Sequence, residues 1–379
     1  ILLVSSFVLI TLGGTTERIK AGVTYIVVSL VSSFIFLGSI ALIYGAVGTV
    51  NFAEIAVRMA ELPQDVQLML HMPLIIAFAI KAALFPLSFW LPDSYPSAPA
   101  PVTAVFAGLL TKVGVYAILR TETLLFWDND ISVLLMVIAL LTMIVGILGA
   151  VAQAGIRRML SFTLVSHIGY MIFGVALGTE LGYAATVFYI VHHIIVQTAL
   201  FLVTGLIERI AGSSSLTHLG GMLKRAPFVA VLFFIPMLNL GGIPPFSGFI
   251  GKVGLFTAGA AQGSVLSYVL IGAGAVTSLL TLYALIRVWN LGFWRTQEQV
   301  VDFSSPMTER ISDTPESAVV TETKSSSRLM TIATTTMVAV SVAITVFAVP
   351  IYDWSETAAF DLFPAEYISS VSNGEVLKP

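Results

Sequence analysis

Long apolar segments are the feature that most restricts how this chain can fold. About 20 apolar residues in a row are enough to cross a lipid bilayer as a helix. Hydrophobic residues make up 57% of the 379 residues and charged residues only 10%, against about 25% in soluble domains. The sequence therefore predicts an all-α integral membrane protein with about ten transmembrane helices. The expected spans are 1–12, 21–47, 66–90, 99–119, 131–152, 159–177, 182–207, 227–258, 266–290 and 329–350.

Three lysines lie well inside these apolar segments: Lys81, Lys112 and Lys252. A charged side chain at membrane depth is costly, so it usually faces a partner or an aqueous cavity and marks an ion pathway. A lysine can instead extend its stem so that the amine reaches the membrane surface. The mid-span positions favour the ion pathway.

Prolines and glycines interrupt the two segments that contain Lys81 and Lys252. Proline lacks an N–H group and clashes with the preceding turn, so a helix breaks there. Broken backbone at membrane depth is tolerated only where it is buried in protein or lines an aqueous cavity. We therefore expect a broken helix with polar, partly hydrated space beside each of these lysines. The interrupting residues are Pro86, Gly242, Pro244 and Pro245.

The chain contains a weak internal repeat. The pattern K-x-x-L-F at Lys81 recurs at Lys252, and loop charges assign opposite directions to the two segments. This pattern predicts two inverted repeats, and paired interrupted segments in such repeats indicate a transport site. The alternative is chance similarity between apolar segments. The expected divisions are residues 1–120, the C-terminal part of the first repeat with a broken helix around 66–90, and residues 121–293, the second repeat with a broken helix around 227–258.

The distribution of lysine and arginine among the loops predicts the orientation, because basic loops remain in the cytoplasm. One set of alternate loops is rich in these residues, and the opposite set holds few. We expect a polar connection at 294–328, a final transmembrane helix at 329–350 and an external tail at 351–379. The basic set is Arg18, Lys20, Arg157, Arg158, Arg209, Lys224, Arg225, Arg295, Lys324 and Arg328.

Histidines provide most of the remaining ionisable groups within the spans. Those that we single out are His167, His192 and His193. Histidine titrates near neutrality, so lysines and histidines joined by water can pass protons along. His167 could equally be an ordinary interhelical hydrogen-bonding residue. Adjacent helical residues point about 100° apart, so we expect only one of His192 and His193 to face the path.

Other kinds of site are disfavoured. The 21 acidic residues lie in loops, tails or near span ends, so the chain offers no carboxylate cage for sodium, a hard cation that prefers oxygen ligands. Cysteine is absent, which excludes disulfides and thiolate-bound metals. We find no nucleotide-binding or hydrolytic motif and no redox cofactor site, and we expect neither a cofactor nor a bound metal.

Several long motifs resemble a known family. FAIKAALFPLSFWLPDSYPSAPAPVTAVFAGLLTKVGVYAILR is similar to the proton-translocating antiporter-like subunits of respiratory complex I and of Mrp-type cation/proton antiporters. LNLGGIPPFSGFIGKVGLF resembles the second broken helix of that family. RRMLSFTLVSHIGYM and VHHIIVQTALFLVTG resemble its intervening helices. The opening LLVSSFVLITLGG and the segment FAVPIYDWSETAAFDL look most like the D subunits of Mrp antiporters.

The resemblance implies a fold of about 14 helices with two inverted five-helix repeats, in which this chain begins in the fifth helix. We therefore read the chain as a fragment without its N-terminal part, including a glutamate that pairs with the first lysine in the family. Lys81 would be the lysine of the first broken helix, Lys112 the connecting lysine and Lys252 the terminal lysine near the exit. Some relatives carry a lysine where Gln197 stands, so here histidine and water would carry more of the path.

These features predict a proton-translocating subunit of a hetero-oligomeric sodium/proton antiporter in a bacterial plasma membrane. Such a chain is a transporter rather than an enzyme. Its partners would be other antiporter subunits, H⁺, Na⁺ and the bilayer, with no nucleic acid. The alternative is a proton-pumping membrane subunit of complex I or of a membrane-bound hydrogenase. A purely structural scaffold would tolerate loss of all three lysines, and a self-contained antiporter would need a central carboxylate.

Overall fold

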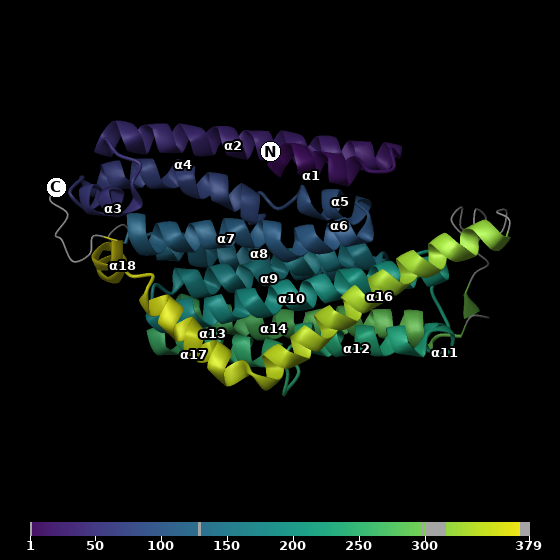
Figure 1. Cartoon of the computed structure of the whole chain (residues 1–379). Coiled ribbons are helices and arrows are strands. Elements are labelled where there is room, and N and C mark those ends of the chain that lie inside the picture. The colour runs from purple at the N-terminus through teal and green to yellow at the C-terminus, as the bar shows by residue number, and fades with distance from the viewer. Residues whose placement is uncertain (1, 128–129, 297–298, 301–315, 372–379) are drawn as a thin grey trace.

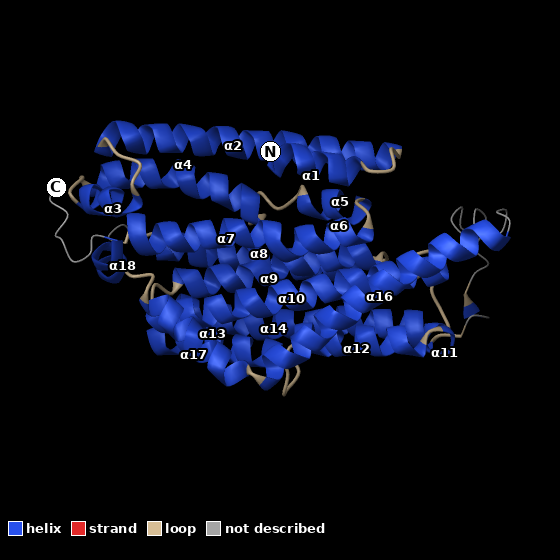
Figure 2. Cartoon of the chain, in the orientation of Figure 1, coloured by secondary structure: helices blue, strands red, loops and turns tan. Residues whose placement is uncertain are grey.

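The structure is a computed structural model that describes residues 2–127, 130–296, 299–300 and 316–371. The regular elements in these residues are helices that lie side by side, most of them along one direction (Figures 1 and 2). Eight are long and apolar enough to cross a membrane, which confirms the predicted fold class. They are α2 (Thr16–Val47), α4 (Gln64–Ala82), the run α6–η3 (Ala100–Leu125), α8 (Ser132–Ala152), α9 (Ile156–Ala176), α10 (Glu180–Ala211), the run α14–η4 (Val265–Trp294) and the apolar part of α16, Arg328–Val346.

Shorter helices complete the bundle. Two of them, α12 and α13, occupy the place of the single expected span 227–258. Within the run α6–η3, the α-helices α6 (Ala100–Val105) and α7 (Thr111–Arg120) alternate with the π-helices η2 (Phe106–Leu110) and η3 (Thr121–Leu125). The other short helices are α1 (Leu2–Thr11), α3 (Phe52–Ala60), α5 (Leu91–Ser94), η1 (Tyr95–Ser97), α11 (Met222–Arg225), α12 (Pro227–Gly241), α13 (Ser247–Gln262), α17 (Ala348–Phe360) and α18 (Pro364–Val371).

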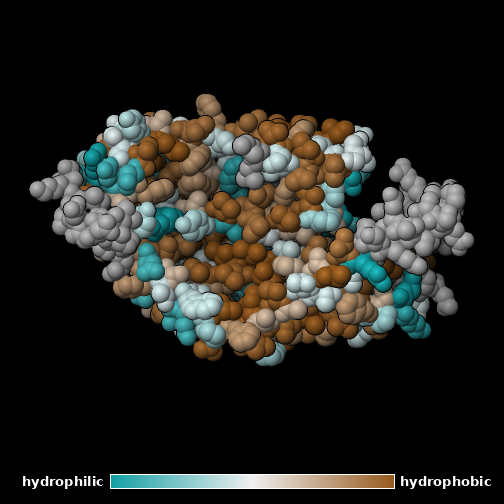
Figure 3. All heavy atoms as spheres, in the orientation of Figure 1, coloured by the Kyte–Doolittle hydropathy of each residue, from teal (hydrophilic) through white to brown (hydrophobic). Residues whose placement is uncertain are grey.

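The surface of the bundle has the polarity that a bilayer requires. Hydrophobic side chains cover the middle of the face in Figure 3, and hydrophilic ones gather at its two ends. The peripheral helix α2 exposes large apolar side chains such as Phe34, which is 80% exposed. Aqueous solvent would make such exposure unfavourable, whereas lipid tails solvate it.

Helix α9 forms the centre of the bundle and is buried almost all round. Its contact with α8 is close because both helices place glycines there. A Cβ on Gly146 of α8 would lie 2.4 Å from the backbone N of Ser166, and a Cβ on Gly169 of α9 would lie 2.7 Å from the backbone N of Met143. Small residues let helix backbones approach in this way within membranes.

Two helices break at membrane depth. Helix α4 ends at Ala82, and the chain then passes through turns to α5. Helix α12 ends at Gly241, and α13 begins at Ser247. The first break follows Lys81 whereas the second precedes Lys252, so the K-x-x-L-F match does not align the two breaks.

The final apolar span lies at Arg328–Val346, close to the expected 329–350, and helices also occupy described parts of the expected polar connection and tail. Helix α16 (Glu316–Val346) starts before 329, because no proline or glycine interrupts the sequence from Glu316 to Val346. Residues 301–315 of the expected connection and 372–379 of the tail lie outside the described residues. Helices α16 and α17 cross the bundle obliquely, packed on α10 (Figure 1).

Candidate functional site

Lys252 lies on α13 just after the second break and is 3% exposed. Its Nζ donates to the carbonyl oxygens of Leu240 (3.1 Å) and Gly241 (3.3 Å) at the end of α12. It also donates to Oγ of Ser278 on α14 (2.8 Å) and lies 5.4 Å from the ring centroid of Tyr170. The C-terminal end of a helix carries partial negative charge, which stabilises a cation. The broken helix thus provides the oxygen atoms that hold this amine.

Two residues, Gly242 and Asn239, determine the geometry of the second break. Gly242 has φ +80°, and a Cβ there would lie 3.0 Å from Nζ of Lys252. Asn239 joins the two halves, because its Oδ1 accepts from the backbone N of Gly248 (2.9 Å) and from Oγ of Ser247 (3.2 Å). Gly242 therefore provides the backbone turn and the space that the lysine needs.

His192 on α10 connects to this break. Its Nδ1 lies 3.0 Å from Oγ of Ser247, the first residue of α13. Its Nε2 is buried and has no hydrogen-bond partner in the described part of the chain. The serine hydroxyl therefore links the imidazole of His192 to the helix that carries Lys252.

His167 and His193 form the middle of the site, at the contact of α9 with α10. Their ring centroids are 5.1 Å apart. Nδ1 of His167 lies 2.8 Å from the hydroxyl oxygen of Tyr189, whose ring is 5.5 Å from that of His192. Buried polar groups normally bond to protein or to ordered water. Nε2 of His167 and both ring nitrogens of His193 have no partner among the described residues, so they are free to bind water.

Lys112 lies beside this group and is 3% exposed. Its Nζ donates to the carbonyl oxygen of Ala107 (2.6 Å) inside the π-helix η2. A π-helix shifts the backbone hydrogen bonds from their α-helical partners, and such segments are frequent at functional sites. The segment that holds Lys112 packs against α10, the helix that carries His192 and His193.

Lys81 lies apart from these residues, at a cavity of about 290 Å³ between α2, α4 and α7. The cavity has a polar side formed by Ser29, Ser32 and Ser33 of α2. In the described part of the chain, Nζ of Lys81 has no hydrogen-bond or ion-pair partner. The wall of the cavity on α7 includes Val113, the residue next to Lys112. The amine of Lys81 therefore faces space that water can occupy.

The structure brings five of the six predicted residues together and places Lys81 at the adjoining cavity. We call the buried series Lys112, His193, His167, Tyr189, His192, Ser247 and Lys252 the polar chain. Both His192 and His193 lie in this series, although we expected only one of them to face the path. Because α10 is packed on several sides, His193 faces His167 while His192 faces Ser247. Pro86, Gly242, Pro244 and Pro245 all lie in the turns at the two breaks.

Several residues of this site were not predicted. Tyr170 lies one helical turn after His167, so its place on the same face could have been recognised from the sequence. Ser278 and Asn239 come from separate helices, and only the packing reveals them. His71 was also missed, although it lies within an expected span, and Glu122 was expected beyond a span end. The structure joins these two side chains, with 2.7 Å between Nε2 and Oε1.

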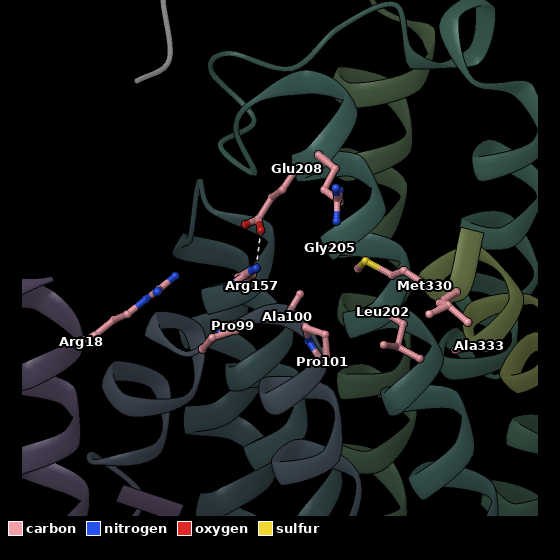
Figure 4. A pocket seen from close by; sticks show the side chains of 12 residues that line it. Arg18, Pro99, Ala100, Pro101, Arg157, Leu202, Gly205, Glu208, Met330 and Ala333 are labelled. Carbon is pink, nitrogen blue, oxygen red and sulfur yellow. Dashed lines mark hydrogen bonds and ion pairs between the residues drawn. The ribbon is translucent and has the colours of Figure 1, made fainter. Parts of the chain in front are cut away.

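A larger cavity of about 750 Å³ opens at the surface end of α9 and α10 (Figure 4). Arg157 on α9 forms an ion pair with Glu208 on α10 beside it. The same guanidinium donates to the carbonyl oxygens of Pro96 (3.1 Å) and Ala98 (2.7 Å). These bonds fix the segment that precedes α6, and hence the start of the run that carries Lys112.

The class of protein follows from a family comparison. The profile of the family described as NADH:quinone oxidoreductase/Mrp antiporter, transmembrane region, matches residues 1–281. The chain belongs to this family.

Particular relatives are antiporter subunits. The chain is 41% identical over 301 residues to the D subunit of the Na(+)/H(+) antiporter of Alkalihalophilus pseudofirmus, covering 79% of this chain and 60% of that protein. It is 36% identical over 302 residues to the corresponding D subunit of Bacillus subtilis, covering 79% and 61%. The chain thus spans about three fifths of the length of these curated relatives.

Solved structures have the same fold. A chain in the Mrp complex from Dietzia sp. DQ12-45-1b has a TM-score of 0.85 and 31% identity, covering 97% of this chain and 74% of that chain. A chain in the membrane-bound sulfane sulfur reductase, an archaeal respiratory membrane complex, has a TM-score of 0.82 and 26% identity, covering 97% and 71%. Respiratory complex I from Thermus thermophilus has a TM-score of 0.72 at 22% identity, covering 93% and 72%, which shows the fold alone.

Proposed function

We propose that this chain is the proton-translocating part of a subunit of a multisubunit sodium/proton antiporter in a bacterial plasma membrane. Protons would move along the polar chain from Lys112 to Lys252, with Lys81 feeding it from the adjoining cavity. Other subunits of the complex would be its partners, and the cation would cross elsewhere in the assembly. The similarity to antiporter D subunits from two bacteria supports both the activity and the membrane.

The observation that carries this proposal is the continuity of titratable groups at membrane depth. The segment that holds Lys112 packs against α10, the rings of His193 and His167 lie 5.1 Å apart, and Ser247 links His192 to the helix of Lys252. Each imidazole has a donor and an acceptor nitrogen when neutral, so it can receive a proton on one side and release it on the other. Water at the unpartnered ring nitrogens would complete the wire.

The proposed role of each lysine follows from its contacts. Lys252, held by two carbonyl oxygens and a hydroxyl, would store a proton at the far end of the polar chain. Lys81, without a described partner, would respond most easily to a charge that approaches its cavity. The family resemblance implies that a glutamate supplies such a charge. A change in that pairing would then drive a proton from Lys81 toward Lys112.

The test uses everted vesicles that contain the complete complex with the full-length chain. A pulse of sodium chloride is added without any respiratory substrate, and the internal pH is followed with a fluorescent dye. We expect sodium to drive proton movement. Choline chloride at the same concentration serves as the control and should give no change. An intact complex that gives no response to sodium or to potassium would contradict the antiporter function.

The second candidate is a proton-pumping membrane subunit of a redox complex. The likeness to a chain of an archaeal respiratory membrane complex, at 26% identity and a TM-score of 0.82, favours it. The same polar chain would then serve a pump driven by electron transfer. In the vesicle experiment this function predicts proton movement only when an electron donor and acceptor are supplied.

A further inference from the structure

A second group of titratable side chains lies outside the polar chain. His71 on α4 is fully buried, and its Nε2 is 2.7 Å from Oε1 of Glu122 on η3. The side chain of Glu122 is 11% exposed, so it is the more accessible member of the pair. The ring of His71 stacks on Phe126, with 4.1 Å between centroids and 9° between planes. The pair is thus built into a defined, largely apolar pocket.

The position of this pair relative to the lysines follows from the packing of two antiparallel helices. Gly114 of α7 lies against Ala82 of α4, where an added Cβ would be 2.6 Å from the backbone N. His71 precedes Lys81 by ten residues, and Glu122 follows Lys112 by ten. Ten residues of helix rise about 15 Å. The two helices therefore carry one titratable level at the lysines and another about 15 Å nearer the end of the bundle, where α3 and α18 lie (Figure 1).

The described residues around the pair leave one ring nitrogen of His71 without a hydrogen-bond partner. Nδ1 of His71 is buried without a hydrogen-bond partner in the described part of the chain, so it can take or give a proton. The guanidinium of Arg120 has other partners. It donates to the carbonyl oxygen of Leu362 (3.1 Å) and lies 4.2 Å from the centroid of the Tyr367 ring. Tyr183 of α10 interacts electrostatically with Glu122. On α3, Glu54 pairs with Arg58 at 3.9 Å.

Phe78 adjoins both the Lys81 cavity and the apolar surroundings of the pair. Phe78 lines the Lys81 cavity, and it also packs against the apolar cluster that contains Leu70, Leu74 and Phe126 around His71. Its ring contacts Phe36 of α2, with 5.3 Å between centroids. A rotation of this ring would change the packing between the two titratable levels.

We propose that His71 and Glu122 form a further proton-binding site, through which protons pass between this end of the bundle and the Lys81 cavity. This inference rests on the proposed function, because it assigns the site as one mouth of the same proton path. Glu122 exchanges protons with water, and His71 relays them inward past Phe78. A buried carboxylate–imidazole pair that served only as a brace would not need to ionise.

The experiment measures sodium-driven proton movement in everted vesicles with the complete complex. His71→Gln and Glu122→Gln each keep polar side chains of similar size but cannot exchange a proton. We expect both variants to assemble and the rate to fall by about 100-fold to 10,000-fold, the range typical of a lost proton-transfer group. The double variant should lose no more than either single one, because the two residues act as a unit. Wild-type rates in both assembled glutamine variants would overturn the proposal.

Two further variants separate the possible failures. Thr123→Val removes a buried hydroxyl without a described partner from the same π-helix, and it should keep the wild-type rate. Lys252→Met should abolish exchange. If Lys252→Met is fully active, the proposed function fails and the inference fails with it. If Lys252→Met is inactive but both glutamine variants are fully active, the proposed proton path stands and the His71–Glu122 pair is a structural brace.

A measurement on the wild-type complex decides the matter if the glutamine variants do not assemble. Dicyclohexylcarbodiimide reacts with protonated carboxyl groups in apolar surroundings, and mass spectrometry locates the modified residue. Modification of Glu122 together with loss of sodium-driven proton movement would support the site. An unmodified Glu122 in complexes that the reagent has inactivated at another carboxyl group would overturn it.

Discussion

At the scale of single residues, the polar chain depends on hydroxyl groups as much as on ionisable ones. Tyr189 contacts His167, and Ser247 contacts His192, so a hydroxyl lies beside each of these imidazoles. A hydroxyl both donates and accepts, and it can therefore transmit a change in the tautomer of its neighbour. These bonds, rather than bonds to carboxylates, orient His167 and His192.

Tyr189→Phe tests this dependence. The substitution keeps the aromatic ring in the core and removes only the oxygen that lies 2.8 Å from Nδ1 of His167. We expect the rate of sodium-driven proton movement to fall about fivefold, equivalent to the loss of about 1 kcal/mol from one hydrogen bond. Vesicle fluorescence gives the rate, and Tyr268→Phe, at an exposed tyrosine on α14, is the matched control. An unchanged rate in Tyr189→Phe would show that His167 needs no such orientation.

The sequence was sufficient to identify the ionisable residues of the site but not the residues that form hydrogen bonds to them. Lysines and histidines within apolar segments are conspicuous because burial is costly for them. Serines are common in membrane helices, so nothing in the sequence distinguishes Ser278 from its neighbours. Asn239 is recognisable as a polar residue within an expected span, but only the packing shows its partners. His71 was recognisable as a histidine within an expected span. Its partner Glu122 was not, since the π-helix η3 extends the span beyond its predicted end at 119.

At the scale of helices, the contact between α4 and α7 sets the spacing of the lysines and of the His71–Glu122 pair. Gly114 makes this contact possible, since even one methyl group there would meet backbone atoms of Ala82. Backbone atoms cannot rotate away as a side chain can. Any enlargement of residue 114 must therefore move one helix relative to the other.

Gly114→Ala should destabilise the protein by about 1–3 kcal/mol, the usual cost of overpacking in a well-packed interior. Thermal denaturation of the purified complex in detergent, followed by size-exclusion fluorescence, measures the loss. Gly38→Ala on α2 is the control, because a Cβ there meets nothing within 4 Å. Equal melting temperatures for the two variants would contradict the close approach of α4 and α7.

Most helix boundaries could be predicted from apolar length alone. For example, α8 was expected at 131–152 and is Ser132–Ala152. The breaks were harder, because proline shows that a helix is interrupted but not on which side of the lysine the chain unwinds. The π-helices were not predicted, since they arise from tertiary packing and have no sequence pattern of their own. The length of α16 was underestimated because its first turns are polar.

At the scale of the whole molecule, the C-terminal segment contacts helices that are far apart in the sequence. Helix α16 supplies Thr345, whose Oγ1 accepts from the backbone N of Ser247 (3.1 Å) at the start of α13. Beyond α17, the carbonyl oxygen of Leu362 accepts from Arg120 at the end of α7 (3.1 Å). The same segment therefore touches the second broken helix and the helix that carries Lys112. We infer that it keeps the ends of the polar chain at a fixed separation.

The central claim is that protons cross the molecule by way of the lysines inside its apolar core. Lys252→Met removes the amine but keeps an unbranched side chain in the cage of Leu240, Gly241 and Ser278. Lys224→Met removes an exposed lysine and is the control. In everted vesicles with equal amounts of assembled complex, we predict that sodium-driven proton movement is lost in Lys252→Met and normal in Lys224→Met. Normal proton movement in Lys252→Met would contradict the account.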